Sequence, residues 1–191
     1  FEPLKTAKWL YIEGYLSTSD TARAAVKQAR ALAKEHGVKI ALSLSDPAMV
    51  QYARQGLEEL MDDGVDLLFC NEQEALMFTN AETLDAAIEV LKSNNQHIVI
   101  TQGANGAVII DPAKQFHVAG RHVNAVDTNG AGDAFAGAFL YAINAGLSLD
   151  AAAQLAILIS SEVVAQFGPR LSVENYAKLF EQFKNAQQEC A

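Results

Sequence analysis

The sequence predicts an α/β fold in which a mostly parallel sheet carries helices on both faces, in the three-layer arrangement of Rossmann-type proteins, with a small antiparallel edge. Three observations support this prediction. Strand-like and helix-like runs alternate through the first half of the chain. The run VDLLFC at 65–70 is apolar throughout, as expected of a strand that is covered on both faces. Three more strand-like runs between 97 and 120 are separated by only a few turn residues, which indicates hairpins.

The first strand is predicted at 8–17, where aromatic and β-branched residues are frequent. Ser19 and Asp20 then offer an N-cap to a run with apolar residues at helical spacing. We expect this helix to extend over 21–37 and to end at Gly37.

The second strand is predicted at 39–46, and the third is the apolar run at 65–70. Between them, Asp46 is a capping residue that is followed directly by Pro47, which is favoured at the first position of a helix. This pair predicts a helix that continues to about Met61.

The middle of the chain predicts two helices, a short one from about 71 to 78 and another over 83–92. Three closely spaced strands follow at 97–103, 106–111 and 115–120. The residues that separate these strands, 104–105 and 112–114, are predicted to form hairpin turns.

The last third of the chain is predicted to be helical, with helices at 133–146, 149–167 and 173–186. The sequence contains no repeat, low-complexity stretch or linker. A chain of 191 residues, half of them hydrophobic, is also long enough to bury a core. We therefore interpret residues 1–191 as a single α/β domain.

The charge balance limits the partners. The chain has 14 Lys plus Arg against 23 Asp plus Glu, a formal net charge of -9. Such a surface repels nucleic acids and anionic lipids, so we expect neither as a partner. No apolar run reaches the roughly 18 to 20 residues that span a bilayer, and no cleavable signal is seen. These features are typical of a cytoplasmic protein. Because the sequence begins with Phe1 rather than Met, we expect it to be a piece of a longer chain.

Cysteine and histidine residues give no sign of a metal or disulfide site. Cys70 and Cys190 are too few and too far apart for a disulfide framework or a zinc site. Cys70 lies in an apolar run and is expected to be buried as a small hydrophobic residue. The four histidines share no common spacing.

The stretch DTNGAGDAF at 127–135 is rich in small residues and leads directly into a helix. At Gly130, Ala131 and Gly132 the backbone can approach a ligand closely, because no large side chain intervenes. The unpaired N–H groups of the first helical turn and the helix dipole favour a negative charge at this position. The sequence therefore predicts an anion hole, with phosphate as the expected occupant.

Asp133 lies inside this predicted anion hole and allows two interpretations. It can be an ordinary acid in the first turn of a helix, which contributes roughly 0.3 to 1 kcal/mol to stability. It can also be a base that accepts the proton of an attacking hydroxyl while neighbouring donors hold a phosphoryl group. The spacing alone leaves both interpretations open. A similar ambiguity affects Asn71 and Glu74, since Asn followed three residues later by Glu is also a helix-capping pair.

Residues 127–133 resemble the DTxGAGD signature of the ribokinase-like, or PfkB, carbohydrate and nucleoside kinases. Two further motifs resemble this family: Asn71 to Glu74 matches its NxxE motif, and Thr101 to Gly106 matches its TxGxxG nucleotide loop. VVAQFGPRLS, at 163–172, stands where the family places a loop against adenine and a monovalent cation. The motifs occur in the family's order over nearly the whole chain. A Walker A motif is absent, which excludes a P-loop enzyme.

The resemblance implies roles for individual residues. Asp133 would be the general base, and Gly130, Ala131 and Gly132 would bind the γ-phosphate through their backbone N–H groups. Asn71 and Glu74 would organise Mg²⁺ and its waters near ATP. Further nucleotide contacts would be made by Thr101, Gly103 and Gly106. A potassium site would have Asp127, Asn129 and Ser172 as ligands. The family usually has Thr or Val where Asn129 stands, although that contact is made by a backbone carbonyl.

The resemblance therefore implies an ATP- and Mg²⁺-dependent kinase, with K⁺ as a further ion, that phosphorylates a primary hydroxyl of a sugar or nucleoside. YIEGYL, CNEQEALMFT and VVAQFGPRLS are most similar to the bacterial branch labelled adenosine kinase or sugar kinase. Members usually have about 300 residues or more. On this comparison the chain is the ATP-binding and catalytic C-terminal part of a larger kinase, without the N-terminal part and the lid through which a homodimer would form. We expect this part alone to be inactive.

Two alternatives remain beside an active kinase. One is a nucleotide- or metabolite-binding module on the same scaffold, without turnover. The other is an acidic α/β domain whose loops are only caps and turns. The presence of Asp133, Asn71 and Glu74 favours the kinase, because a binding module does not need a base. These residues do not identify the acceptor.

Overall fold

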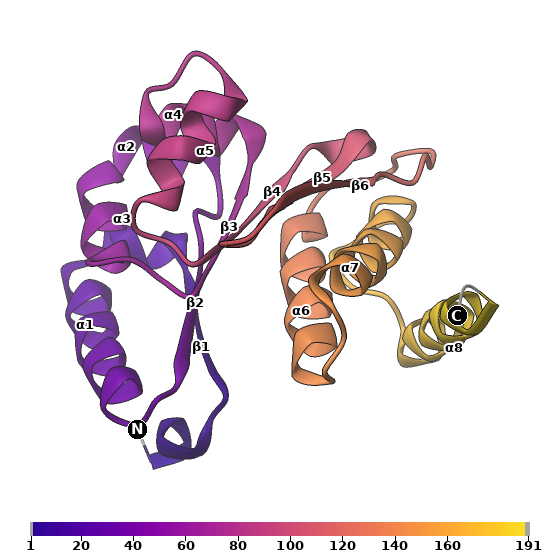
Figure 1. The fold of residues 1–191 in the computed structure, drawn as a ribbon, viewed down its shortest axis with the longest axis horizontal. Helices are drawn as coiled ribbons and strands as arrows, with labels where there is room; N and C mark the ends of the chain where they lie inside the picture. Colours follow the sequence, from indigo (N-terminus) through magenta and orange to yellow (C-terminus); the bar gives the residue numbers. More distant parts are fainter. Residues whose placement is uncertain (1, 190–191) are drawn as a thin grey trace. The chain divides into compact units, whose positions relative to one another are not determined.

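A computed structural model describes residues 2–189. Cys190, for which the sequence predicts no disulfide, lies outside the described residues. The chain divides into two compact units. The first unit takes the described residues up to Gln102 together with Val108–Phe116. The second takes Gly103–Ala107 together with the described residues from His117 onwards. Figure 1 shows the course of the chain through both units. That residues 1–191 form a single domain stays a prediction.

Six strands form one sheet in the order in which they follow one another along the chain. They are β1 (Trp9–Glu13), β2 (Lys39–Ser43), β3 (Leu67–Asn71), β4 (His97–Thr101), β5 (Gly106–Ile110) and β6 (Gln115–Ala119). The first four are parallel neighbours, with Tyr11 opposite Ala41, Ala41 opposite Leu67, and Leu67 opposite His97. Short connections join β4 to β5 and β5 to β6, so these strands alternate in direction. The predicted α/β class, with a mostly parallel sheet and an antiparallel edge, is confirmed.

Eight α-helices accompany the strands within residues 2–189: α1 (Asp20–Glu35), α2 (Pro47–Tyr52), α3 (Arg54–Met61), α4 (Glu72–Thr79), α5 (Leu84–Lys92), α6 (Ala131–Asn144), α7 (Leu149–Val164) and α8 (Val173–Glu189). Three short 3₁₀ helices are η1 (Glu2–Thr6), η2 (Gly14–Thr18) and η3 (Gly103–Asn105). No helix in this part of the chain is both long and apolar enough to cross a membrane.

The predicted helix starts are confirmed by capping hydrogen bonds. The Ser19 hydroxyl accepts a hydrogen bond from the Ala22 N–H at the start of α1. The Asp46 carboxylate accepts one from the Ala48 N–H, with Pro47 at the first position of α2. Side-chain oxygens satisfy backbone N–H groups that have no partner within the helix, so these residues fix where each helix begins.

Several predicted elements end earlier in the structure, among them the strands predicted at 39–46 and 97–103, which end at Ser43 and Thr101. Two further differences have an identifiable tertiary cause. The strand predicted at 8–17 ends at Glu13, and the chain turns into η2. Gly14 lies against β2, where an added Cβ would be only 2.6 Å from the carbonyl oxygen of Leu44, and its N–H donates to the Ser45 hydroxyl at 2.7 Å. This tertiary contact competes with strand extension.

The helix predicted from Pro47 to Met61 is divided into α2 and α3 at Ala53, whose ψ is 26°. Directly after the break, the Arg54 guanidinium donates to the carbonyl oxygens of Met77 and Phe78 at the end of α4, at 3.2 and 2.6 Å. These two hydrogen bonds satisfy carbonyl groups at a helix C-terminus and hold the start of α3 in place.

The core of the first unit lies between its strands and α1 to α5, which cover one face of the strands (Figure 1). Alternate strand residues such as Leu68 and Cys70 belong to this core. Leu67 and Phe69, which point to the opposite face of β3, are buried as well. Both predictions for this run are thus confirmed: β3 is buried on both faces, and Cys70 is a buried residue.

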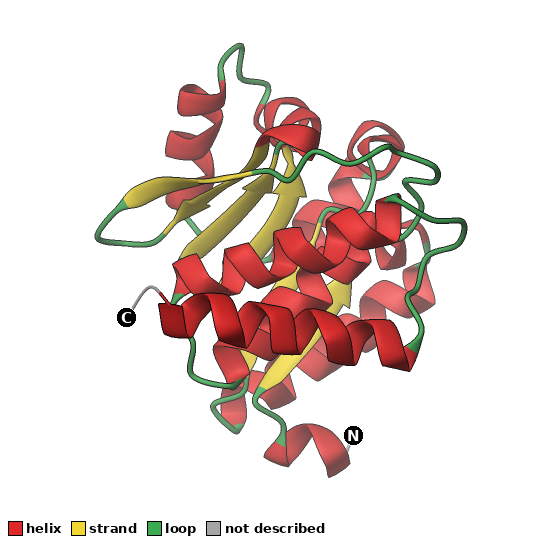
Figure 2. Ribbon diagram, turned by 90° about the vertical axis from the view of Figure 1, so that its right-hand side faces the viewer, coloured by secondary structure: helices red, strands yellow, loops and turns green. Residues whose placement is uncertain are grey.

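The second unit contains the long helices α6, α7 and α8, which Figure 2 shows in a view turned from Figure 1. α6 and α7 pack together, and α7 also contacts α8. Both helices bury small residues, among them Ala138 and Ala142 of α6 and Ala152 and Ala156 of α7. An aromatic pair, Tyr141 and Phe180, joins α6 to α8 with ring centroids 4.8 Å apart.

Candidate functional site

Polar residues end all four parallel strands of the first unit. β1 ends at Glu13, β2 at Ser43, β3 at Asn71 and β4 at Thr101, with Asn71 opposite Thr101 in the sheet. In open α/β sheets, ligands bind outside the carboxyl ends of the strands. The predicted residues Asn71 and Thr101 are therefore brought together at the edge where this fold places its sites.

Asn71 and Glu74 form a complete capping box at the start of α4. The Asn71 side-chain oxygen accepts from the Glu74 N–H at 2.8 Å. In return, the Glu74 carboxylate accepts from the Asn71 N–H at 2.9 Å and from the Asn71 side-chain amide at 2.7 Å. The capping interpretation of this pair is confirmed.

Glu74 is a buried carboxylate, with only 4% of its surface exposed. Burial raises the pKa of Glu74 to about 7, although the hydrogen bond from the Asn71 backbone lowers it and the charge of Asp46 raises it further. A carboxyl group that titrates near neutral pH is suited to exchanging a proton for a cation. Titratable groups perturbed in this way are concentrated at functional sites.

The chemistry of this pair fits magnesium. A carboxylate and an amide offer hard oxygen donors, and each carboxylate oxygen keeps a further lone pair beside its hydrogen bond. Within residues 2–189 no group of three or more His, Cys, Asp or Glu side chains is arranged to hold a metal ion. A cation that keeps several of its waters and takes few protein ligands is compatible with such a site.

One polar contact at the same edge is not predicted from the sequence. The Ser45 hydroxyl donates to the Glu13 carboxylate at 3.0 Å and accepts from the Gly14 N–H at 2.7 Å. Ser45 has a φ of 70°, a conformation that side chains other than Asn, Asp and Gly seldom adopt. The contact fixes the orientation of Glu13 at the end of β1. Its only sequence signal is an acidic residue within a strand-like run.

The predicted nucleotide loop runs from Thr101 through η3 to Gly106, the first residue of β5. Gly106 has a φ of 101°, and an added Cβ would be 2.0 Å from the carbonyl oxygen of Val118. The backbone conformation and the close approach of Val118 therefore require a glycine at position 106. Gly103 has open space around it, with nothing within 4 Å of an added Cβ.

The predicted anion hole is at the start of α6, in the second unit. Gly130 is the N-cap, with φ 75° and ψ 1°, and no side chain caps this helix. An added Cβ at Gly130 would be 2.4 Å from the Pro169 side chain. The first-turn N–H groups of α6 therefore lie at a helix start that is free of a capping side chain, as an anion requires.

Gly132 and Asp133 are the second and third residues of α6, and both are exposed. Nothing lies within 4 Å of an added Cβ at Gly132, so the backbone there is open to a ligand. Asp133 follows directly, so that its carboxylate and the open turn belong to the same first turn of the helix.

Asp127 joins two loops of the second unit. Its carboxylate accepts from the Asn129 N–H at 3.0 Å and from the Gly168 N–H at 3.1 Å. These two hydrogen bonds, the one from Asn129 first, lower the pKa of Asp127. The structure thus brings Asp127 and Asn129 together with the loop that follows α7.

Ser172 takes part in the start of α8. Its hydroxyl accepts from the Asn175 N–H at 3.2 Å, and its carbonyl oxygen accepts from the Tyr176 N–H at 3.0 Å. This arrangement is that of an N-cap residue. The contacts of Ser172 are with α8 rather than with Asp127 or Asn129.

Comparisons with known proteins agree with these motifs. Residues 1–175 match the pfkB family carbohydrate kinases. An adenosine kinase from Schizophyllum commune is 29% identical over 182 residues, which cover 85% of this chain and 52% of that protein. A ribokinase from Lactococcus lactis subsp. lactis is 33% identical over 154 residues, covering 78% of this chain and 47% of that protein.

The fold is shared with solved structures. The crystal structure of adenosine kinase from Sinorhizobium meliloti superimposes with a TM-score of 0.89 and 33% sequence identity, over 95% of this chain and 56% of that chain. The present chain thus spans about half the length of the relatives it matches.

Proposed function

The chain belongs to the pfkB family of carbohydrate kinases, and from this premise we propose that the protein transfers the γ-phosphoryl group of ATP to a primary hydroxyl of a sugar or nucleoside. The observation that carries the proposal is the start of α6. There, Asp133 follows an uncapped, open glycine turn within the same first helical turn.

In this reaction Asp133 acts as the general base. The acceptor oxygen forms a bond to the γ-phosphorus as the bond from that phosphorus to the β,γ-bridging oxygen breaks, and ADP leaves. The proton of the acceptor hydroxyl passes to the Asp133 carboxylate. The N–H groups of Gly130 to Gly132 stabilise the charge on the transferred group, because donors that are already oriented need no reorganisation during the reaction.

Asn71 and Glu74 would hold Mg²⁺, which supplies charge neutralisation at the ATP phosphates when bound. Their capping box supports this role, because it fixes both side chains before a ligand arrives. Thr101, Gly103 and Gly106 would contact the nucleotide. Asp127 and Asn129 would contribute to a potassium site, supported by their position in one turn. Ser172, which caps α8, would be the further ligand of that site that the family resemblance implies.

The first experiment measures ADP release by the full-length gene product with Mg-ATP and a panel of acceptors. The panel contains adenosine, other nucleosides, ribose, fructose and phosphorylated sugars. We expect turnover with one class of acceptor, and we expect Asp133→Asn to lower it at least 100-fold while ATP binding stays nearly unchanged. Loss of a general base costs typically 10²- to 10⁴-fold in rate.

Asp85→Asn provides the matched control. Asp85 is also an exposed acid in the first turn of a helix, α5, so its replacement removes the same charge from an equivalent position. We expect this variant to keep its turnover. Equal activity of both variants would make Asp133 an ordinary helix-stabilising acid. ATP binding without turnover on any acceptor would favour a nucleotide-binding module instead.

A further inference from the structure

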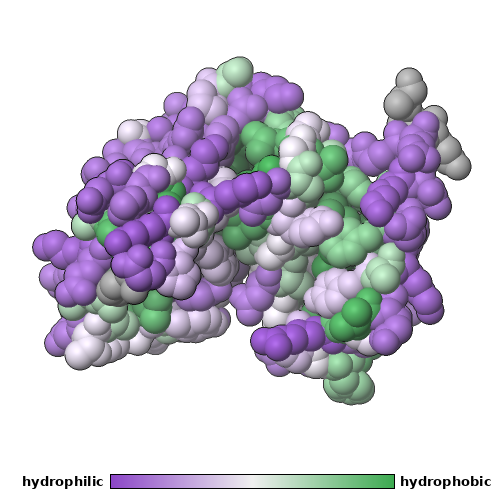
Figure 3. All heavy atoms as spheres, turned by 90° about the horizontal axis from the view of Figure 1, so that it is seen from below, coloured by the Kyte–Doolittle hydropathy of each residue, from purple (hydrophilic) through white to green (hydrophobic). Residues whose placement is uncertain are grey.

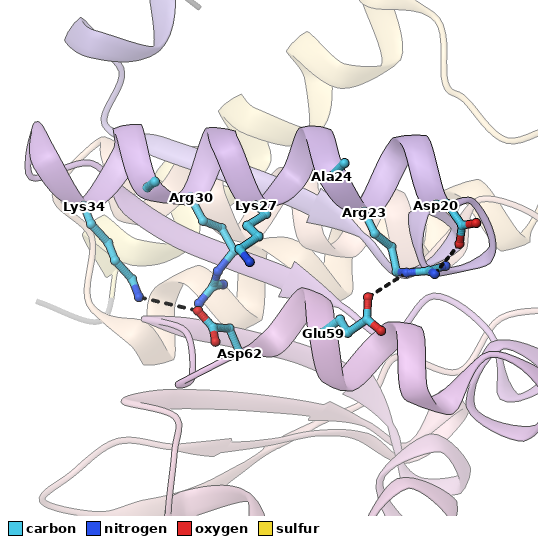
Figure 4. Close-up of a pocket in the computed structure, with 9 residues that line it drawn as sticks. Asp20, Arg23, Ala24, Lys27, Arg30, Lys34, Glu59 and Asp62 are labelled. Carbon is cyan, nitrogen blue, oxygen red and sulfur yellow. Dashed lines mark hydrogen bonds and ion pairs between the residues drawn. The ribbon is translucent and has the colours of Figure 1, made fainter.

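A groove in the first unit shares no residue with the candidate functional site. It has a volume of about 620 Å³ and is formed by α1 together with the end of α3. Its lining is almost entirely charged, with side chains from both helices pointing into it (Figure 4). We call it the α1–α3 groove, and its charged lining residues are Asp20, Arg23, Lys27, Arg30, Lys34, Glu59 and Asp62.

α1 supplies all four cations of the groove. Arg23, Lys27, Arg30 and Lys34 recur at intervals of three or four residues, so they lie along one side of the helix. They amount to four of the 14 basic residues in a chain with a net charge of -9. The groove lining thus carries four positive and three negative side chains, whereas the chain as a whole is strongly acidic. The left side of Figure 3 shows a predominantly hydrophilic surface over the first unit.

Ion pairs within the first unit engage three of these four side chains. Arg23 bonds to Asp20 and, at 2.7 Å, to Glu59. Lys34 lies 2.7 Å from Asp63 and 3.9 Å from Asp62. Within residues 2–189, Lys27 has neither a hydrogen bond nor an ion pair, although its exposed side chain points into the groove beside Arg30 (Figure 4). One full positive charge in the groove is thus uncompensated by contact.

Arg30 is the unusual member of the set. Its side chain is only 3% exposed, yet just one of its three nitrogens is bonded: Nη2 donates to the Gly64 carbonyl oxygen at 2.9 Å and to the Asp63 carboxylate at 3.2 Å. Nε and Nη1 have no partner among the described residues. Buried donors without an acceptor are costly and rare in folded proteins, and each one calls for a partner such as a bound anion.

We propose that the α1–α3 groove binds the phosphate group of a small phosphorylated molecule between Lys27 and Arg30. Lys27 contributes a mobile point charge, and the guanidinium of Arg30 contributes fixed donors that suit phosphate oxygens. The carboxylates of Glu59 and Asp62, on the opposite side of the groove, accept hydrogen bonds from hydroxyl groups of the same ligand. This site shares no residue with the proposed phosphoryl-transfer site, so it acts as a separate binding site.

The test is a titration of the full-length protein with inorganic phosphate and with glycerol 3-phosphate, followed by isothermal calorimetry and by the NMR signals of the arginine Nε–H groups. We expect saturable binding, with a shift of the Arg30 Nε–H signal. Lys27→Gln should weaken this binding about tenfold, because a charge-assisted hydrogen bond contributes roughly 1.5 to 3 kcal/mol and each 1.4 kcal/mol is a factor of ten. Tighter binding of glycerol 3-phosphate than of phosphate would support the part played by the carboxylates.

Lys178→Gln is the matched control, because Lys178 is an exposed lysine on α8 and its replacement removes the same charge at a distant position of the sequence. Binding weakened equally by both variants would reflect net charge and overturn the proposal. Phosphate can also bind at the start of α6, so Gly132→Ala is titrated in parallel. If Gly132→Ala abolishes all binding while Lys27→Gln and the Arg30 signal show no effect, the groove is not a phosphate site. An absence of any binding leads to the same conclusion.

Discussion

Glu74 combines burial with a titration near neutral pH, and this makes the stability of the protein depend on pH. The pKa of Glu74 is raised from 4.5 to about 7 in the folded protein, mainly by burial. Between these two values the folded state binds more protons than the unfolded state, so the free energy of unfolding falls as the pH rises. The favourable contribution is complete below pH 4.5 and is lost as the pH rises through 7.

We predict that Glu74→Gln removes this part of the pH dependence. A shift of this size corresponds to about 3 kcal/mol between pH 4.5 and pH 8. The measurement is urea unfolding at several pH values without magnesium. It gives the difference in the free energy of unfolding between the wild-type protein and the variant. Glu72→Gln, the other first-turn glutamate of α4, is the control for loss of charge. A difference that stays constant across this range would contradict the buried titration.

The same variant tests the proposed metal role. Magnesium requires an ionised ligand, so Glu74→Gln should raise the Mg²⁺ concentration that half-saturates turnover, whereas Glu72→Gln should leave it nearly unchanged. The measurement is a magnesium titration of ADP release at pH 8. An unaltered half-saturation in Glu74→Gln would restrict this residue to its capping role.

At the scale of elements, the two glycines at the start of α6 differ in what the fold requires of them. Its N-cap, Gly130, needs a left-handed backbone and lies against Pro169, so a side chain there disturbs the fold. Gly132, two residues later, has neither constraint. The open space beside Gly132 in the first turn of α6 is compatible with the close approach of a ligand.

We predict opposite effects on stability and activity for Gly132→Ala. Ala has the higher helix propensity, so the free energy of unfolding should rise by up to about 1 kcal/mol. Turnover should fall at least tenfold, because the new methyl group enters the space where the transferred phosphoryl group is held. Thermal unfolding and ADP release on the same sample test both effects.

Gly137→Ala is the control on the same helix. Gly137 is exposed in the middle of α6, and nothing lies within 4 Å of an added Cβ there. This variant should gain stability and keep full turnover. Full turnover in Gly132→Ala as well would show that the glycine turn does not approach the reacting group.

At the scale of the whole molecule, the length of the chain matters most. It spans about half the length of its relatives, and the family resemblance implies that acceptor-binding parts lie in the other half. We predict that residues 1–191 alone bind ATP more weakly than the full-length gene product and release ADP at least 100-fold more slowly. An acceptor that is neither held in position nor shielded from water reacts slowly. Equal rates for the two proteins would show that these residues suffice.

Local rules predicted most of the fold. The caps at Ser19 and Asp46 and the apolar run of β3 act over a few residues, so their signals are present in the sequence itself. The same holds for the start of α6, where glycines and an acid are neighbours in the sequence. The capping box of Asn71 and Glu74 was one of the two interpretations that the sequence left open, because its two residues are also close in the sequence.

Contacts between distant residues were not predictable. Ser45 contacts Glu13 across 32 positions of the chain, and Arg54 breaks a helix by reaching carbonyl groups of α4 more than 20 positions away. The unpaired nitrogens of Arg30 also depend on packing between α1 and the end of α3. Such features arise from tertiary structure, which can override local propensity.

The position of β1 has a practical consequence for work with this chain. β1 is the first strand in the sheet order, and within residues 2–189 it pairs only with β2. β1 has the sequence WLYIE, without proline and with a charged residue only at its end. Open apolar edges of this kind recruit strands from other molecules and promote aggregation. A preparation of residues 1–191 should therefore be handled at low concentration, and turbidity on standing would originate from this edge rather than from the acidic surface.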